Sequence, residues 1–203
     1  MSPRGVAIPD VREPLFQAAE RVLLRDGPSG LTSRAITSEA GVAKGILHNH
    51  FTDLDGFLAA FVLDRFGLIA EDAAKLPSRA GAGTVVGNLT DAALSLFGPN
   101  ALAIISLVLS RPALMRRLQE SVAAGGPDLR RIEGRFAAYL DAEKQLGRVA
   151  ADADTDTLAL AVVGTVHHLF LTGRASGPPL RRRVRRIVTM LVAAAAPSSP
   201  APR

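Results

Sequence analysis

Two short helical patterns near the N-terminus carry the polar residues whose types and spacing best suit a binding surface. A helix expected over 33–40 is followed by Gly41, which can turn the chain in a left-handed conformation, and by a second short helix over 43–49. Five apolar residues of this pair are spaced to form a small shared core: Ile36, Ala40, Val42, Ile46 and Leu47. The remaining positions of the second helix are polar or bare: Lys44, Gly45, His48 and Asn49. This helix-turn-helix pattern is typical of a surface that enters a DNA groove, and equally of a three-helix unit that only packs.

The histidines do not have the spacing of a metal site. His48 and His50 are two residues apart, so on a helix their side chains point about 200° apart. The neighbours His167 and His168 diverge by about 100°. His167 falls on an apolar helical face, where it is either a satisfied core or interface residue or a residue that touches a ligand. Because the chain also has no cysteine, we expect no metal centre.

Two further motifs imitate known sites without their key residues. Asp152, Asp154 and Asp156 resemble the start of a calcium loop, but the loop's glycine and final glutamate are absent, so an acidic helix N-terminus explains them better. The glycines at 81, 83 and 87 imitate a nucleotide-binding loop, but no strand precedes them. No set of nucleophile, base and acid emerges. We therefore expect a protein that is not an enzyme and needs no cofactor.

The charge of the chain does not by itself indicate nucleic acid. The 203 residues carry a formal net charge of +5, yet residues 1–60 hold six basic and seven acidic side chains. The excess lies downstream, most densely in the arginine run 181–186, which is either a solvated rim of the last helix or a second anion contact. The longest uncharged apolar run, 101–109, is about half of what a bilayer needs. We expect a cytoplasmic protein without a membrane anchor, associated with the nucleoid when bound to DNA.

Hydrophobic residues recur with a helical period throughout, and no stretch alternates as a half-buried strand does. The fold class expected is all-α, with about nine helices. Turn residues such as Asp26-Gly27-Pro28 and the loop from Pro77 to Gly83 separate them. We expect a helix-turn-helix head over 1–52, a helical body for ligand binding and dimerisation over 53–196, and a disordered tail over 197–203.

The segment LTSRAITSEAGVAKGILHNHF, residues 31–51, together with the preceding helix LFQAAERVLLRDG, closely resembles the DNA-binding signature of the TetR family of bacterial transcriptional regulators. The resemblance implies that Thr32 places its hydroxyl on a DNA phosphate, that Lys44 reaches a base edge, and that His48 stands where the family usually has a phosphate-binding tyrosine. Nine residues are implied to contact DNA: Thr32, Ser33, Arg34, Ala43, Lys44, Gly45, His48, Asn49 and His50. One position departs from the pattern, because Leu54 stands where the family commonly has a phosphate-clamping lysine.

The helix expected over 154–173 resembles the family's penultimate dimerisation helix. It has two apolar faces, one with Val162 and Leu169 and another with Leu160, Val163 and Phe170, and Gly164 permits close approach of a partner. The resemblance implies a homodimer that binds a palindromic double-stranded operator. An unknown, largely apolar effector would enter the body among seven residues chosen by helix position and type: Phe61, Phe97, Ile104, Met115, Phe136, Tyr139 and His167. The function expected is ligand-controlled repression. The alternative is a helical sensor that binds a small molecule or a protein and has lost tight DNA binding.

Overall fold

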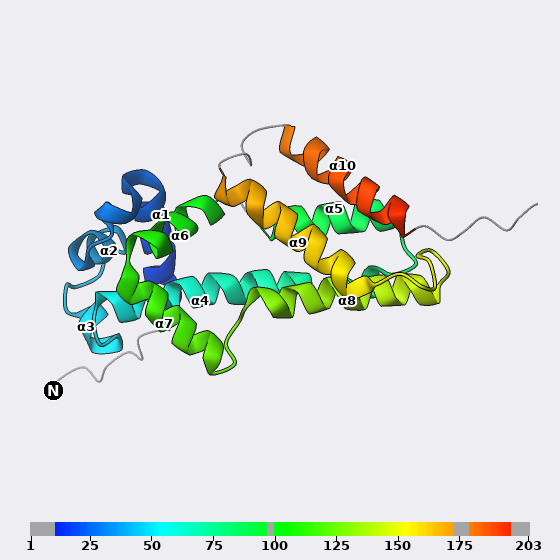
Figure 1. The fold of residues 1–203 in the computed structure, drawn as a ribbon. Coiled ribbons are helices and arrows are strands. Elements are labelled where there is room, and N and C mark those ends of the chain that lie inside the picture. The colour runs from blue at the N-terminus through cyan, green and yellow to red at the C-terminus, as the bar shows by residue number, and fades with distance from the viewer. Residues whose placement is uncertain (1–10, 97–99, 173–178, 196–203) are drawn as a thin grey trace, which may run out of the picture. The chain divides into compact units, whose positions relative to one another are not determined.

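The computed structural model describes residues 11–96, 100–172 and 179–195. These residues form ten α-helices and one short 3-10 helix and contain no strand, which confirms the all-α class with one helix more than expected. The elements, shown in Figure 1, are α1 (Arg12–Gly30), α2 (Ser33–Glu39), α3 (Ile46–His50), α4 (Leu54–Ala73), η1 (Pro77–Arg79), α5 (Val85–Ser95), α6 (Ala101–Ser110), α7 (Pro112–Ala123), α8 (Leu129–Gln145), α9 (Thr155–Leu171) and α10 (Pro179–Ala194). The tail expected over 197–203 lies outside the described residues.

The chain divides into two compact units. The first comprises residues 1–64 and 103–124, and the second comprises residues 65–102 and 125–203. Besides the head expected over 1–52, the first unit contains the start of α4 and the segment 103–124. The segment 103–124 is joined to the head by contacts between side chains far apart in the sequence. Local sequence patterns do not predict such contacts.

The first unit is built around α1. Helix α1 has its kink at Gly27, whose φ of 71° is a left-handed conformation that glycine adopts without strain, so the helix proper ends where the Asp-Gly-Pro sequence predicts. The first unit buries apolar residues of α1, α2, α3 and α4: Leu15, Phe16, Ala19, Val22, Leu23, Ile36, Leu47, Phe57, Leu58 and Phe61. This core joins the two short helices to the longer ones. It stabilises α2 and α3, because helices this short are not stable in isolation.

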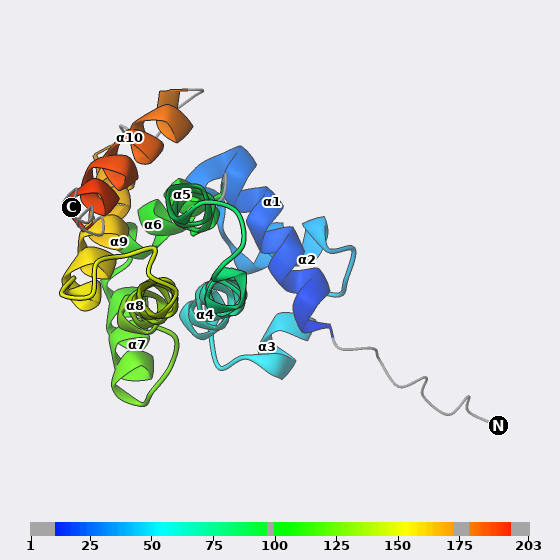
Figure 2. The same cartoon turned by 90° about the vertical axis from the view of Figure 1, so that its right-hand side faces the viewer.

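The second unit packs α8 against α9 and α5 against α10 around one apolar core. Helices α9 and α10 lie side by side in Figures 1 and 2, and contacts between them support this. Three of these helices begin at a side-chain cap, since Thr84, Asp128 and Asp154 each accept a hydrogen bond from the backbone amide three residues later. Asp154 is therefore the N-cap of α9, and Asp156 lies in its first turn. Among the described residues, no helix is long and apolar enough to cross a membrane.

A buried polar network holds η1 and the following loop onto α8. The side-chain amide of Asn88 donates to the hydroxyl of Tyr139 at 3.0 Å and to the carbonyl of Ala82 at 2.8 Å. The fully buried carboxylate of Glu143 pairs with the guanidinium of Arg148 at 3.1 Å. Burial raises the pKa of Tyr139, whose hydroxyl stays protonated at neutral pH. The loop between η1 and α5 is therefore held by specific hydrogen bonds in addition to the packing of Ala80 on the apolar core.

Candidate nucleic-acid interface

The first helix of the candidate interface, α2, begins at Thr32. The Thr32 hydroxyl oxygen accepts a hydrogen bond of 3.1 Å from the amide of Ala35, which satisfies one of the free donors at the helix start. One turn further on, the buried hydroxyl of Thr37 donates to the carbonyl of Ser33 at 2.9 Å. A short helix of seven residues is thus held by its cap and by an internal side-chain bond.

The turn between the two short helices has its centre at Gly41. Its φ of 68° confirms the left-handed turn expected from the sequence. The amide of Val42 returns to the carbonyl of Thr37 at 3.0 Å, a bond that closes the end of a helix around a left-handed residue. The chain then reverses within a few residues, so α3 packs against α2.

The second helix of the helix-turn-helix, α3, which we call the recognition helix, is shorter than expected. Helix α3 spans Ile46–His50, whereas the sequence indicated 43–49. Lys44 and Gly45 therefore lie in the turn that leads into α3 rather than in its first helical positions. The amide of Ile46 bonds to the carbonyl of Ala43 at 3.0 Å, which makes this stretch a tight turn. Glycine at 45 has a low helix propensity, which favours the late start.

A cluster of four phenylalanines fixes the end of α3. The rings of Phe51 and Phe57 meet edge to face with centroids 5.0 Å apart, and the ring of Phe16 lies 6.3 Å from Phe51. The rings of Phe57 and Phe61 lie 5.6 and 5.9 Å from that of Phe16. Aromatic pairs at these distances add stability beyond their buried area. The polar residues of α3 are thus presented from a fixed base formed by α1 and α4.

Six residues of α2, α3 and the turn between them line one concave surface of about 350 Å³: Ser33, Arg34, Thr37, Lys44, Gly45 and His48. Five of these are among the nine residues predicted to contact DNA, and Thr37 is an addition. Of the other predicted residues, Thr32, Ala43, Asn49 and His50 are all exposed. Their contact with DNA remains a prediction. The structure places them on the two short helices and on their flanking residues.

Two arginines of α1 are already paired. Glu39 at the end of α2 accepts hydrogen bonds from Arg21 at 2.7 Å and from Arg25 at 2.8 Å. The hydrogen bonds from Arg25 and Arg21 hold the pKa of Glu39 below its usual value. These cations therefore join α1 to α2. Among the described residues of the helix-turn-helix, Arg34 and Lys44 are the cations without an ion pair.

Two arginines from the segment 103–124 reach the start of α4. Arg111 donates to a carboxylate oxygen of Asp55 at 3.1 Å and to the carbonyl of Leu31 at 3.2 Å. Arg117 donates to the Oδ2 atom of Asp53 at 2.8 Å. The sequence analysis missed these residues, because partners more than fifty positions apart leave no local pattern.

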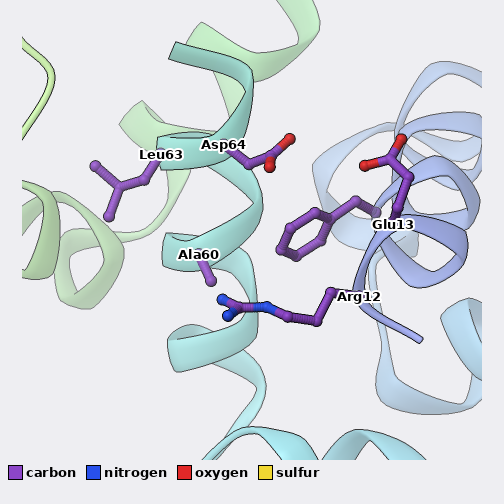
Figure 3. Close-up of a pocket in the computed structure, with 6 residues that line it drawn as sticks. Arg12, Glu13, Ala60, Leu63 and Asp64 are labelled. Atoms are coloured by element: carbon purple, nitrogen blue, oxygen red, sulfur yellow. The ribbon is translucent and has the colours of Figure 1, made fainter. Parts of the chain in front are cut away.

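A second cavity of the first unit, of about 530 Å³, lies between α1 and α4. Figure 3 shows Arg12 reaching from α1 toward Ala60, with Asp64 pointing from α4 toward α1. The guanidinium of Arg12 lies 5.9 Å from the ring centre of Phe16 and 5.5 Å from that of Phe51. This is a cation–π arrangement. Arg12 therefore belongs to the aromatic base of α3, and the cavity has a charged lining.

The seven candidate effector residues are divided between the units. Phe61, Ile104 and Met115 belong to the first unit, and Phe136, Tyr139 and His167 belong to the second. Phe97 lies outside the described residues. Phe136 and Tyr139 are fully buried in the core of the second unit, while His167 is half-buried. An effector site built from these residues remains a prediction.

Helix α9 buries residues of both apolar faces that the sequence indicates. Val163 and Phe170 of one face lie in the unit's own core together with Val162 and Leu169 of the other. Helical spacing instead leaves one exposed stripe, formed by Leu160, Gly164, His168 and Leu171. Leu160 is 55% exposed and Leu171 50%. On the neighbouring α10, Met190 is 69% exposed. A β-carbon added at Gly164 would meet nothing, so this face is open.

Helices α2 and α3, the tight turn between them and the exposed groove that they line form a helix-turn-helix. Residues 15–61 match the model of the bacterial regulatory proteins of the TetR family. This match covers the helix-turn-helix and the helices on either side of it, so this region of the chain is similar to the DNA-binding domain of that family. A comparison of the sequence with curated proteins gives no match.

Solved structures of regulators share the fold over nearly the whole chain. A TetR-family transcriptional regulator of Mesorhizobium loti has a TM-score of 0.73 and 20% identity, over 91% of this chain and 96% of its own. The regulator FadR of Bacillus subtilis, in complex with stearoyl-CoA, has a TM-score of 0.62 and 18% identity, over 89% and 97%. The multidrug binding protein EbrR, complexed with imidazole, has a TM-score of 0.60 and 23% identity, over 96% and 98%. The chain therefore has the TetR fold from its head through its helical body.

Proposed function

We propose that this protein is a ligand-responsive transcriptional repressor, which binds a palindromic operator as a homodimer and leaves it when a small molecule binds the helical body. The observation that carries the proposal is the groove between α2 and α3, where Arg34, Lys44 and His48 line one exposed concave surface. Side chains of this kind serve both phosphates and base edges. As a DNA-bound regulator the protein acts in the cytoplasm, at the nucleoid.

The exposed stripe on α9 supports the dimer. Large apolar side chains rarely line up on the surface of a monomer unless a partner covers them. Leu160, Leu171 and the neighbouring Met190 are such side chains, and the bare Gly164 allows a partner helix to approach closely. Two copies that pair through α9 and α10 form a four-helix interface with two-fold symmetry. Such a dimer presents two heads to the two halves of a palindrome.

The related structures support a small-molecule effector. FadR binds stearoyl-CoA and EbrR binds imidazole in structures with the same fold. We propose a largely apolar effector for this chain. An effector releases DNA when it binds better to the conformation whose heads are wrongly spaced. Reversing a 99:1 population needs about 5.5 kcal/mol of differential binding.

A mobility-shift titration with the DNA upstream of the protein's own gene tests the proposal. A discrete complex that competes poorly with unrelated duplex, together with a dimer by light scattering, is the expected result. The scarcity of unpaired cations on the helix-turn-helix favours the second candidate, a sensor without tight DNA binding. Absence of a discrete complex even at low salt would support that sensor, and a monomer at micromolar concentration would exclude the two-headed arrangement.

A further inference from the structure

The ion pair between Arg117 and Asp53 lies beside the recognition helix. Asp53 is three residues beyond His50, the last residue of α3, so the two Cα atoms are at most about 11 Å apart. Duplex DNA carries one phosphate per strand for every ~3.4 Å of its axis. The guanidinium of Arg117 is 2.8 Å from Asp53. It therefore lies close enough to His50 to reach a DNA phosphate only a few positions along the strand from one that His50 binds.

The surroundings of Arg117 leave its guanidinium available. The Arg117 side chain is 37% exposed and Asp53 is 49% exposed. Arg117 uses one of its nitrogens on Asp53, and a guanidinium has five N–H donors, so further acceptors can be bound at the same time. Arg111 differs, since it is bound both to Asp55 and to the carbonyl of Leu31 and is only 26% exposed. Arg111 therefore serves the structure of the unit.

The position of Arg117 is otherwise unfavourable for a cation. A helix N-terminus carries partial positive charge, which repels an arginine placed beside it. The guanidinium nevertheless lies against the first turn of α4, where a β-carbon on Gly56 would come within 2.8 Å of its Nη1 atom. Asp53 compensates the partial charge of the helix N-terminus and the charge of the guanidinium. Its Oδ1 accepts a hydrogen bond from the amide of Gly56 at 2.6 Å, and its Oδ2 accepts one from Arg117. The same contacts hold the pKa of Asp53 below its usual value.

The charge of the helix-turn-helix itself is small. Residues 31–52 contain two formal cations, Arg34 and Lys44, and Arg21 and Arg25 are bound to Glu39. Phosphate contacts supply much of the affinity for DNA. We propose that Arg117, contributed by α7, binds a backbone phosphate of the operator next to the contact of α3, in competition with its ion pair to Asp53. This inference rests on the proposed DNA-binding function and adds a residue outside the helix-turn-helix to it.

The salt dependence of DNA binding tests the proposal, with Arg116 as a matched control. Arg116 is the neighbour of Arg117 on α7, is exposed and forms no ion pair among the described residues. Affinity for a labelled duplex from the upstream region is measured over a series of KCl concentrations for the full chain, Arg117→Gln, Arg117→Lys and Arg116→Gln. Loss of one phosphate contact per head lowers the slope of log affinity against log salt by ~0.9, or ~1.8 per dimer.

The expected result is a lower slope for Arg117→Gln, a slope near that of the parent for Arg117→Lys, and no comparable change for Arg116→Gln. Equal slopes for Arg117→Gln and Arg116→Gln would overturn the proposal, because both variants lose one charge. If Arg117→Gln does not fold, Asp53→Asn replaces it. An asparagine at 53 still caps α4 and removes one negative charge beside the phosphate, so binding becomes tighter. Unchanged or weaker binding by folded Asp53→Asn would also overturn it.

The test separates this inference from the proposed function. A parent protein that binds neither the upstream duplex nor an unrelated duplex at low salt contradicts DNA binding altogether. A parent that binds, and whose slope does not depend on Arg117, contradicts only the role of Arg117. A double variant, Asp53→Asn with Arg117→Gln, adds a check on the mechanism. The gain in affinity from Asp53→Asn should be larger when Arg117 is present.

Discussion

The hydroxyl oxygen of Thr32 accepts a hydrogen bond of 3.1 Å from the amide of Ala35, so this exposed side chain caps α2 at the edge of the groove. Its hydroxyl hydrogen is still available for a phosphate oxygen. Thr32→Ala should lower the free energy of unfolding by about 1 kcal/mol through the lost cap. It should also weaken binding to all DNA sequences about equally, because phosphates carry no sequence information. Thr32→Ser should restore both, measured by denaturant unfolding and by binding to specific and unrelated duplexes.

Lys44 is exposed in the turn before α3 and lines the groove. Lys44→Ala should reduce specific binding by ~1–3 kcal/mol if its ammonium donates to a guanine. It should also relax the preference at one position of each operator half-site. Binding measured against a panel of single-base operator variants checks this. If Lys44→Ala and Thr32→Ala change the sequence preference alike, the division into a base contact and a phosphate contact is wrong.

Leu54 begins α4 and its side chain is partly buried. Leu54→Lys should add one phosphate contact per head, tighten binding at low salt and steepen the salt slope by ~1.8 in a dimer. A lysine can keep its aliphatic stem on the apolar surface while its ammonium reaches solvent. The slopes of parent and variant are compared after thermal unfolding shows that the variant is folded. An unchanged slope in a folded variant excludes the contact at this position.

Glu39 links α2 to α1 through Arg25 and Arg21, which lower its pKa in the folded state from the usual 4.5. A carboxylate with a lowered pKa stabilises the fold above its unfolded pKa, and this contribution disappears as the pH falls through the folded value. Glu39→Gln should therefore lower the melting temperature modestly at pH 7. The two proteins should converge progressively below about pH 4.5. Melting curves at several pH values check this, and a gap that does not narrow as the pH falls below 4.5 would assign the effect to packing.

Much of the fold follows from local patterns. The helical period predicts the all-α class, and Gly27 and Gly41 mark turns because left-handed backbone is accessible to glycine. The apolar spacing of α2 and α3 places Ile36 and Leu47 in the core, where both are fully buried. These features depend on residues that are close together in the sequence, and sequence periodicity therefore predicts them.

The parts that local patterns do not predict depend on distant residues. The ring of Phe51 at the end of α3 packs against Phe16 of α1 and Phe57 of α4, and no local pattern predicts this contact. Similarly, α9 has apolar residues on most sides. The neighbours of its own unit decide that Val163 and Phe170 turn inward and Leu160 outward. The ion pairs of Arg111 and Arg117 join positions more than fifty residues apart.

The first unit is discontinuous in sequence, and this has a consequence for engineering. The chain passes from the first unit into the second, returns for residues 103–124, and leaves again. A head cut off at residue 64 loses the partners of Asp53 and Asp55. A hybrid regulator made by joining this head to a foreign sensor at one crossover point would carry the same defect. The transplantable cassette consists of two pieces, residues 1–64 and 103–124. Chimaeras that exchange both should retain DNA binding where single-crossover fusions lose it.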